Sequence, residues 1–126
     1  MKDYSAFRPS FEAALDERLY RIEHLDALIG SGRAQIWFGA HSAIVAEVRE
    51  YPTGARAMHG LVAAVDPEAP PGAGLDEIVG TLIPRAEAWG RSVGCVLAVI
   101  ESRPGWVRKL EAGGYRIHQT AVRKTL

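Results

Sequence analysis

The sequence has little cysteine, no long apolar run and no excess of charge of either sign. Its single cysteine, Cys95, excludes a disulfide within the chain and fits a reducing compartment. No stretch approaches the roughly 18 apolar residues that a membrane helix requires, and no apolar signal segment follows the first residues. Fifteen basic residues balance fifteen acidic ones, so no net field draws the chain toward nucleic acid or anionic lipid. These absences predict a soluble, intracellular protein that binds neither a membrane nor nucleic acid.

The composition is that of one globular domain over residues 1–126. Apolar residues make up 48% of the sequence and charged residues 24%, and a chain of this length buries roughly two thirds of its unfolded surface on folding. The sequence contains no repeat, linker or low-complexity segment. The four histidines lie on different predicted elements without the spacing of metal ligands, so we expect no metal site at His24, His41, His59 or His118.

The first half of the chain predicts one helix and three strands. Apolar residues recur every three or four positions between Ser10 and Gly30, which predicts an amphipathic helix with Ser10 as its N-cap. Residues 34–38, 42–51 and 57–65 are short apolar or alternating runs separated by turn residues. They predict an antiparallel meander.

The second half begins with a proline-rich loop at residues 66–74. The apolar spacing of residues 75–93 predicts a long helix with a bend at Pro84, because the proline ring crowds an earlier carbonyl. Residues 95–100 form a continuous apolar run, which is typical of a central strand covered on both faces. The remaining predicted elements are a short helix and a last strand, at 104–113 and 115–126.

The predicted order of elements is therefore α-β-β-β-α-β-α-β. A helix joins the third strand to the fourth, so these two strands can run parallel through a right-handed crossover. The expected fold class is α/β (α+β), with a mixed, largely antiparallel sheet flanked by helices.

Residues 59–126 resemble the second half of the GNAT superfamily of N-acetyltransferases, in which a short helix ends in a glycine-aromatic pair such as Gly114-Tyr115. The acetyl-CoA signature of that family is Arg/Gln-x-x-Gly-x-Gly/Ala. Gly72 and Gly74 supply its glycines and are the candidate cofactor-binding residues, but Ala69 stands at the Arg/Gln position. The flanking pair Pro70-Pro71 also removes two main-chain donors from a loop that has to bind phosphate.

The other landmarks of the family also differ. The residues at its asparagine, alanine and tyrosine positions are Arg103, Trp106 and Leu110. In the family the tyrosine protonates the thiolate of coenzyme A, which leucine cannot do. The resemblance therefore implies a GNAT fold without its chemistry, and with no cofactor. Two carboxylates remain as candidate bases: Glu101, after the fourth strand, and Glu47.

A second, narrower resemblance is to small GNAT-like proteins encoded by bacteriophages and prophages. It rests on motifs in four places: Trp37-Phe38-Gly39, the spacing Glu47-x-x-x-Tyr51-Pro52, Ala88-Trp89 with Gly94-Cys95, and Arg103-Pro104-Gly105-Trp106. Gly90 and Ser102 depart from the pattern. The resemblance implies a non-catalytic component of a phage particle, located in the virion or the host cytoplasm.

Under that interpretation the protein acts through contacts with other virion proteins or with a second copy of itself. Aromatic residues and arginine are enriched at protein interfaces, so the candidate contact residues are Arg103, Trp106 and Tyr115. The alternative interpretation is an acetyl-CoA-dependent N-acetyltransferase with an atypical cofactor loop. In that case Glu101 is the candidate catalytic base.

Overall fold

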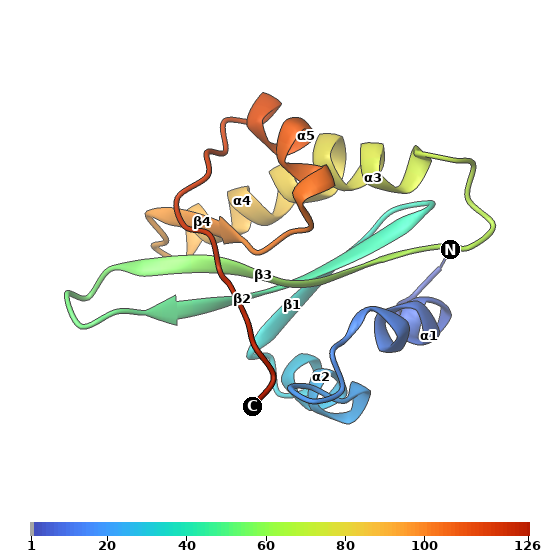
Figure 1. Cartoon of the computed structure of the whole chain (residues 1–126), viewed down its shortest axis with the longest axis horizontal. Helices are drawn as coiled ribbons and strands as arrows, with labels where there is room; N and C mark the ends of the chain where they lie inside the picture. Colours follow the sequence, from blue (N-terminus) through green and yellow to red (C-terminus); the bar gives the residue numbers. More distant parts are fainter. Residues whose placement is uncertain (1) are drawn as a thin grey trace.

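The computed structural model describes residues 2–126, which form a four-stranded sheet with helices on both faces (Figure 1). The first half contains α1 (Tyr4–Ala14), α2 (Ile22–Gly30), β1 (Ala34–Phe38), β2 (Ser42–Glu50) and β3 (Arg56–Val65). The second half contains α3 (Ala73–Glu77), a π-helical turn (Ile78–Leu82), α4 (Ile83–Ser92), β4 (Leu97–Ile100), a 3-10 turn (Pro104–Trp106) and α5 (Val107–Ala112).

The strands lie in the order β1-β2-β3-β4. The first three are antiparallel neighbours, and β4 pairs parallel to β3 after the crossover through α3 and α4. The expected mixed, largely antiparallel sheet and its flanking helices are confirmed. α1 and α2 cover one face, and α3, α4 and α5 lie on the other (Figure 1).

The alternation of side chains along β2 divides the apolar residues between two cores. On one face, Val45 packs in a cluster with Phe7 and Phe11 of α1. On the other face, Ile44 packs in a cluster with Leu82 from the helical crossover. Because successive side chains of β2 point to opposite faces, this strand packs against helices on both sides of the sheet.

The helix predicted from Ser10 to Gly30 is wrong, because two helices occupy this region. α1 begins earlier, where the Asp3 side chain accepts a hydrogen bond from the Ala6 amide, and it contains Ser10 in its interior. It ends at Leu15, whose backbone is extended. The next residue, Asp16, accepts a hydrogen bond from the Arg18 amide, and such local bonding competes with a helix.

The bend expected at Pro84 takes the form of a π-helical turn immediately before it. Ile78–Leu82 is π-helical, and Pro84 is the second residue of α4. In a regular α-helix the ring of Pro84 would clash with the carbonyl one turn earlier, and proline has no amide to donate to that carbonyl. A π-helical turn before Pro84 accommodates both effects.

The strand predicted at 115–126 is wrong, because this segment has no regular secondary structure. In consequence β4 is an edge strand, and the expectation that residues 95–100 form a central strand covered on both faces is also wrong. Val96 is 72% exposed and Leu97 is 60% exposed. The apolar run favours a strand with neighbours on both edges, but residues 2–126 place no strand beside the outer edge of β4.

Candidate functional site

The pairing of β3 with β4 is short and leaves half of β3 open. It runs from the pair Ala57 and Leu97 to the pair Gly60 and Ile100. β3 continues to Val65, and no residue of β4 lies opposite this second half. Main-chain groups of residues 61–65 on this side of β3 therefore have no strand partner within residues 2–126.

A β-bulge lies where the pairing of β3 with β4 ends. Ala46 of β2 pairs with Gly60, but the preceding Val45 pairs with Val62, so Leu61 is an extra residue in β3. Both Leu61 and Val62 pack toward the α1–α2 core. A bulge increases the local twist of a strand, which favours the separation of β3 from β4 at this point.

Beside the bulge lies a polar cluster built on His59. The ring is 6% exposed, and its Nε2 lies 2.9 Å from the Tyr51 hydroxyl. Glu47 is the register partner of His59 on β2, and its Oε1 accepts a hydrogen bond of 3.1 Å from Arg49. Glu101 follows Ile100 at the end of β4 and acts electrostatically on the same ring. We call His59, Glu47, Tyr51 and Glu101 the His59 cluster.

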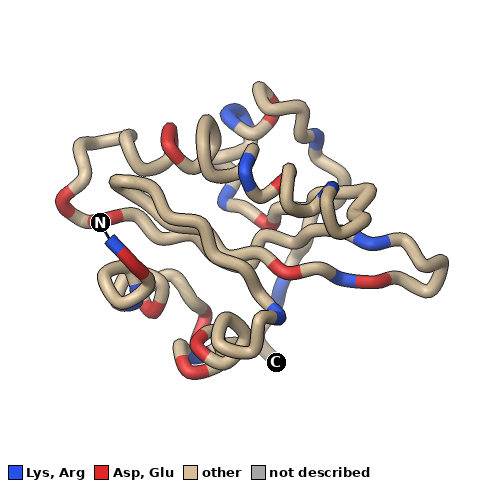
Figure 2. The backbone as a smooth tube through the Cα atoms, turned by 180° about the vertical axis from the view of Figure 1, so that it is seen from behind, with Lys and Arg blue, Asp and Glu red and all other residues tan. Residues whose placement is uncertain are grey.

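The position of the His59 cluster follows from the charge pattern of the strands. Residues 34–46 contain no Asp, Glu, Lys or Arg. Figure 2 shows the charged residues of β2 and β3 gathered toward the turn that joins these two strands. Odd-numbered residues of β2 face α1 and α2, so Glu47 faces the same side, beyond the apolar core.

Burial lowers the pKa of His59, and the nearby Arg49 lowers it further, against the opposite effects of Glu101 and Glu47. The ring is therefore neutral at physiological pH, with a lone pair that can accept a proton. Of the cluster, the sequence indicated Glu101 and Glu47 as candidate bases. It did not indicate Tyr51, because the contact depends on the turn between β2 and β3.

We expect the low pKa of His59 to make the protein less stable as the pH falls from 7.5 to 5.5. The unfolded chain binds a proton at the ordinary pKa of about 6.5, whereas the folded chain binds it only at lower pH, so acid favours unfolding. Urea unfolding at both pH values measures the loss, which should be smaller in His59→Gln. An equal loss in both proteins would contradict the assignment of a low pKa to His59.

The loop that carries the sequence candidates Gly72 and Gly74 lies at the other end of the open half of β3. Gly72 has a positive φ of 79° and immediately precedes α3. Gly74 is buried, and a Cβ at this position would lie 2.4 Å from Val65 Cγ1. The Ala73 amide donates to the Pro70 carbonyl and the Asp76 amide to the Gly72 carbonyl. Within residues 2–126 the Gly74 and Leu75 amides have no main-chain acceptor, so these two are available to another acceptor.

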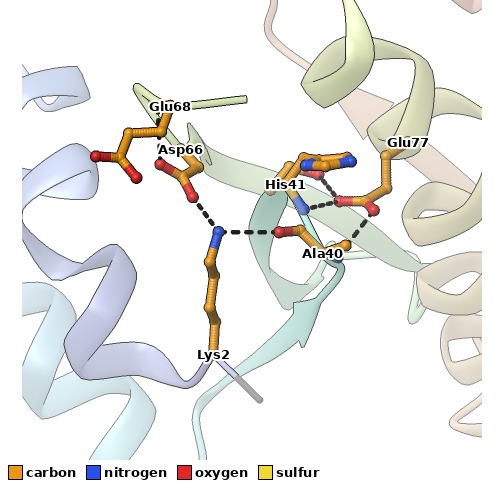
Figure 3. A network of polar contacts seen from close by, with 7 residues as sticks. Lys2, Ala40, His41, Asp66, Glu68 and Glu77 are labelled. Atoms are coloured by element: carbon orange, nitrogen blue, oxygen red, sulfur yellow. Dashed lines mark hydrogen bonds and ion pairs between the residues drawn. The ribbon is translucent and has the colours of Figure 1, made fainter. Parts of the chain in front are cut away.

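A polar network fixes this loop and the end of α3 to the turn between β1 and β2 (Figure 3). The Glu77 carboxylate accepts hydrogen bonds from the Ala40 and His41 amides, each of 2.9 Å, and one of 2.5 Å from the Ser42 hydroxyl. Lys2 binds both Asp66 and the Ala40 carbonyl. Burial raises the pKa of Glu77, but its three hydrogen bonds outweigh burial and lower it overall. The sequence analysis missed Glu77, since its donors lie 35 to 37 residues away.

The candidate contact residues occupy different environments. Arg103 is exposed before the 3-10 turn, whereas Trp106 is half-buried and packs against the core under α4. The Tyr115 hydroxyl donates a hydrogen bond of 2.7 Å to Glu87 on α4. Leu110, at the position of the family's tyrosine, is buried in the same core. The structure thus brings Glu101 and Glu47 to one ring, but does not bring Arg103, Trp106 and Tyr115 onto one exposed surface.

Within residues 2–126, no group of three or more His, Cys, Asp or Glu side chains is arranged to hold a metal ion. Over the same residues, no helix has the length and apolar content needed to span a membrane.

Solved structures with a similar fold exist, although no family model matches the sequence and no curated protein is detectably similar to it. An acetyltransferase from Trypanosoma brucei is 17% identical, with a TM-score of 0.71 over 98% of this chain and 93% of its own. Glucosamine-6-phosphate N-acetyltransferase from Arabidopsis thaliana is 13% identical, with a TM-score of 0.68 over 98% of this chain and 94% of its own. An acetyltransferase from Clostridium acetobutylicum, solved with acetyl-CoA, is 8% identical, with a TM-score of 0.63 over 82% of this chain and 71% of its own.

The chain therefore has the fold of the GNAT acetyltransferases. The expectation of a non-catalytic component of a phage particle is wrong, because the structures that share this fold over nearly the whole chain are acetyltransferases. They favour the alternative interpretation. The expectation that the protein has no cofactor depended on the non-catalytic interpretation and is not supported, since one of these acetyltransferases was solved with acetyl-CoA. The narrower likeness to phage proteins finds no support in these structures.

Proposed function

We propose that the protein is an acetyl-CoA-dependent N-acetyltransferase that acts on an amine. The observation that carries the proposal is the open half of β3, which joins the glycine turn before α3 to the His59 cluster. Residues 60–65 span roughly 16 Å at about 3.3 Å per residue. A strand edge of this length is unpaired on one side and has a proton acceptor at one end. It suits the transfer of an acetyl group from acetyl-CoA, whose thioester lies at the end of a long arm.

The residues of the glycine turn fit the phosphate end of acetyl-CoA. Pro70 and Pro71 lack amides, but both precede the turn, so the Gly74 and Leu75 amides in the first turn of α3 remain to bind phosphate. Gly72 offers no side chain to block them. Lys109 of α5 forms an ion pair with Asp76 in the first turn of α3, which places a cation near the N-terminal end of α3. The open edge of β3 would hold the extended arm by main-chain hydrogen bonds, and the bound group supplies the acetyl thioester.

At the other end, His59 takes the proton from the acceptor amine. An ammonium group has no lone pair, so it has to lose a proton before it attacks a carbonyl. A neutral imidazole with a lowered pKa accepts that proton. Tyr51 holds the ring at Nε2, and the exposed Glu101 attracts a cationic amine to the end of β4.

The missing tyrosine at Leu110 does not prevent this reaction. A thiol has an ordinary pKa near 8.5, so the leaving thiolate can take a proton from water at neutral pH without a dedicated acid. A buried leucine at this place removes one contribution to the rate and leaves the attack of the amine intact.

The proposal predicts that acetyl-CoA raises the stability of the protein. A ligand at 100 times its dissociation constant adds about 2.7 kcal/mol to the free energy of unfolding. Thermal unfolding with and without acetyl-CoA measures the effect, with adenosine as the control ligand because it lacks the phosphates and the arm. The absence of any shift at millimolar acetyl-CoA would rule out the proposed function.

A further inference from the structure

The proton acceptor of the candidate site is buried, and its hydrogen-bond partner is an exposed tyrosine. His59 is 6% exposed, whereas Tyr51 is 43% exposed. The Tyr51 hydroxyl lies 2.9 Å from Nε2 of the His59 ring, and the centres of the two rings are 6.3 Å apart. Tyr51 therefore presents far more surface to an incoming amine than the imidazole does.

The turn between β2 and β3 holds the backbone of Tyr51 in place. Tyr51 directly follows the last residue of β2, and the ring of Pro52 fixes φ at the next position. The Tyr51 amide donates a hydrogen bond of 2.9 Å to the Ala55 carbonyl, and the Tyr51 carbonyl accepts one of 2.8 Å from the Gly54 amide. Because both of its main-chain groups are bound within the turn, Tyr51 reaches His59 from a fixed position.

A hydroxyl bound to an imidazole suits the movement of a proton. A neutral imidazole has one protonated nitrogen and one lone pair. With the proton on Nδ1, Nε2 of His59 accepts a hydrogen bond from the Tyr51 hydroxyl, whose oxygen keeps lone pairs for a second partner. A tyrosine hydroxyl can accept one proton while it donates another, so it stays neutral while a proton passes through it.

Carboxylates on the two neighbouring strands favour the protonated form of the ring. Glu47 is the register partner of His59 on β2, and the exposed Glu101 follows the end of β4. Both carboxylates act on the ring in the direction that favours its positive charge, and Arg49 acts in the opposite direction. Within residues 2–126 Arg49 is paired with Glu47, whereas Glu101 forms no ion pair. Glu101 is therefore free to attract a cationic amine.

We propose that Tyr51 is a catalytic residue that relays the proton of the acceptor amine to His59, which rests on the proposed N-acetyltransferase function. An N–H bond of the ammonium group breaks as an O–H bond forms on Tyr51. The original O–H bond of Tyr51 breaks as an N–H bond forms at Nε2 of His59. Tyr51 ends as it began, His59 becomes an imidazolium, and the neutral amine attacks the thioester. The imidazolium then returns its proton to water along the same path.

Tyr51→Phe tests the relay, because it removes only the hydroxyl. We expect kcat to fall about 10²-fold, with no change in the KM for acetyl-CoA or in the thermal stabilisation by acetyl-CoA. Tyr4→Phe is the matched control. The Tyr4 hydroxyl donates a hydrogen bond to Asp26 on α2, so this variant also loses one hydroxyl contact, but outside the His59 cluster. Its kcat for a panel of primary amines, measured by thiol release, should equal that of the wild type.

Two further measurements separate proton transfer from a structural role of the hydroxyl. The double variant Tyr51→Phe/His59→Gln should have the kcat of His59→Gln alone, because residues that act as one unit give non-additive losses. In mixtures of H₂O and D₂O, the wild-type kcat should fall along a curve as the deuterium fraction rises, because two protons move in one step. The Tyr51→Phe protein should lose this curvature.

The outcomes distinguish the relay from the function on which it rests. A Tyr51→Phe protein with more than half of the wild-type kcat would overturn the relay and leave the acetyltransferase function in place. A straight-line dependence on deuterium in the wild type would do the same. A wild type that neither acetylates an amine nor is stabilised by acetyl-CoA would overturn both.

Discussion

His59→Gln is expected to lower kcat by about 10²- to 10³-fold, because it removes the group that takes the proton from the acceptor amine. Glutamine keeps a polar side chain beside Tyr51 but cannot accept a proton at neutral pH. The KM for acetyl-CoA should change little, because the glycine turn lies at the far end of the open half of β3. The measurement is the release of free thiol from acetyl-CoA in the presence of a panel of primary amines.

His41→Gln is the matched control for this variant. His41 lies in the turn between β1 and β2 and contacts Glu77 through its main chain, so the same exchange of side chain there should leave kcat unchanged. Thermal unfolding of both variants checks that each is folded. If His59→Gln kept more than half of the wild-type kcat, His59 would not be the base, and Glu101 would be the next residue to change.

Gly39→Ala and Glu77→Ala are each expected to destabilise the protein by about 2–3 kcal/mol, and the double variant by little more than either alone. A Cβ on Gly39 would lie 2.1 Å from Glu77 Oε1, so it displaces the carboxylate from its three donors. Glu77→Ala takes the acceptor from the buried Ser42 hydroxyl and the half-buried His41 amide, and a buried donor without a partner costs about 1–3 kcal/mol. Non-additivity is expected because both changes break one network.

Urea unfolding of the two single variants and the double variant measures these changes. Gly80→Ala is the matched control, because nothing lies within 4 Å of a Cβ at that position. It should be neutral or slightly stabilising, since alanine favours a helix over glycine by up to about 1 kcal/mol. Single variants whose effects add fully would show that Gly39 and Glu77 act independently.

Short-range patterns predicted the elements whose pairing is local. The strands β1, β2 and β3 follow one another through short turns, so alternation and turn residues were enough to find them. The break between α1 and α2 was missed because the apolar spacing runs through it without interruption. Only the side-chain hydrogen bond of Asp16 and the earlier cap at Asp3 separate the two helices.

Contacts between distant residues could not be predicted in this way. The apolar run at 95–100 predicted a strand but not its neighbours, and within residues 2–126 no strand lies on its outer side. In the candidate site, Glu101 and Glu47 were identified as carboxylates near strand ends. Their shared electrostatic effect on His59 depends on the register of three strands, which no single segment contains.

The extra residue Leu61 has a consequence for how such a site arises. Removing Leu61 would return the strand to regular alternation and leave Ala63 facing α4, because Leu61 and Val62 already face the same side of the sheet. An uninterrupted sheet and an open one therefore differ by a single codon. A lineage can gain or lose the binding edge in one insertion or deletion, while the helices on both faces keep their places.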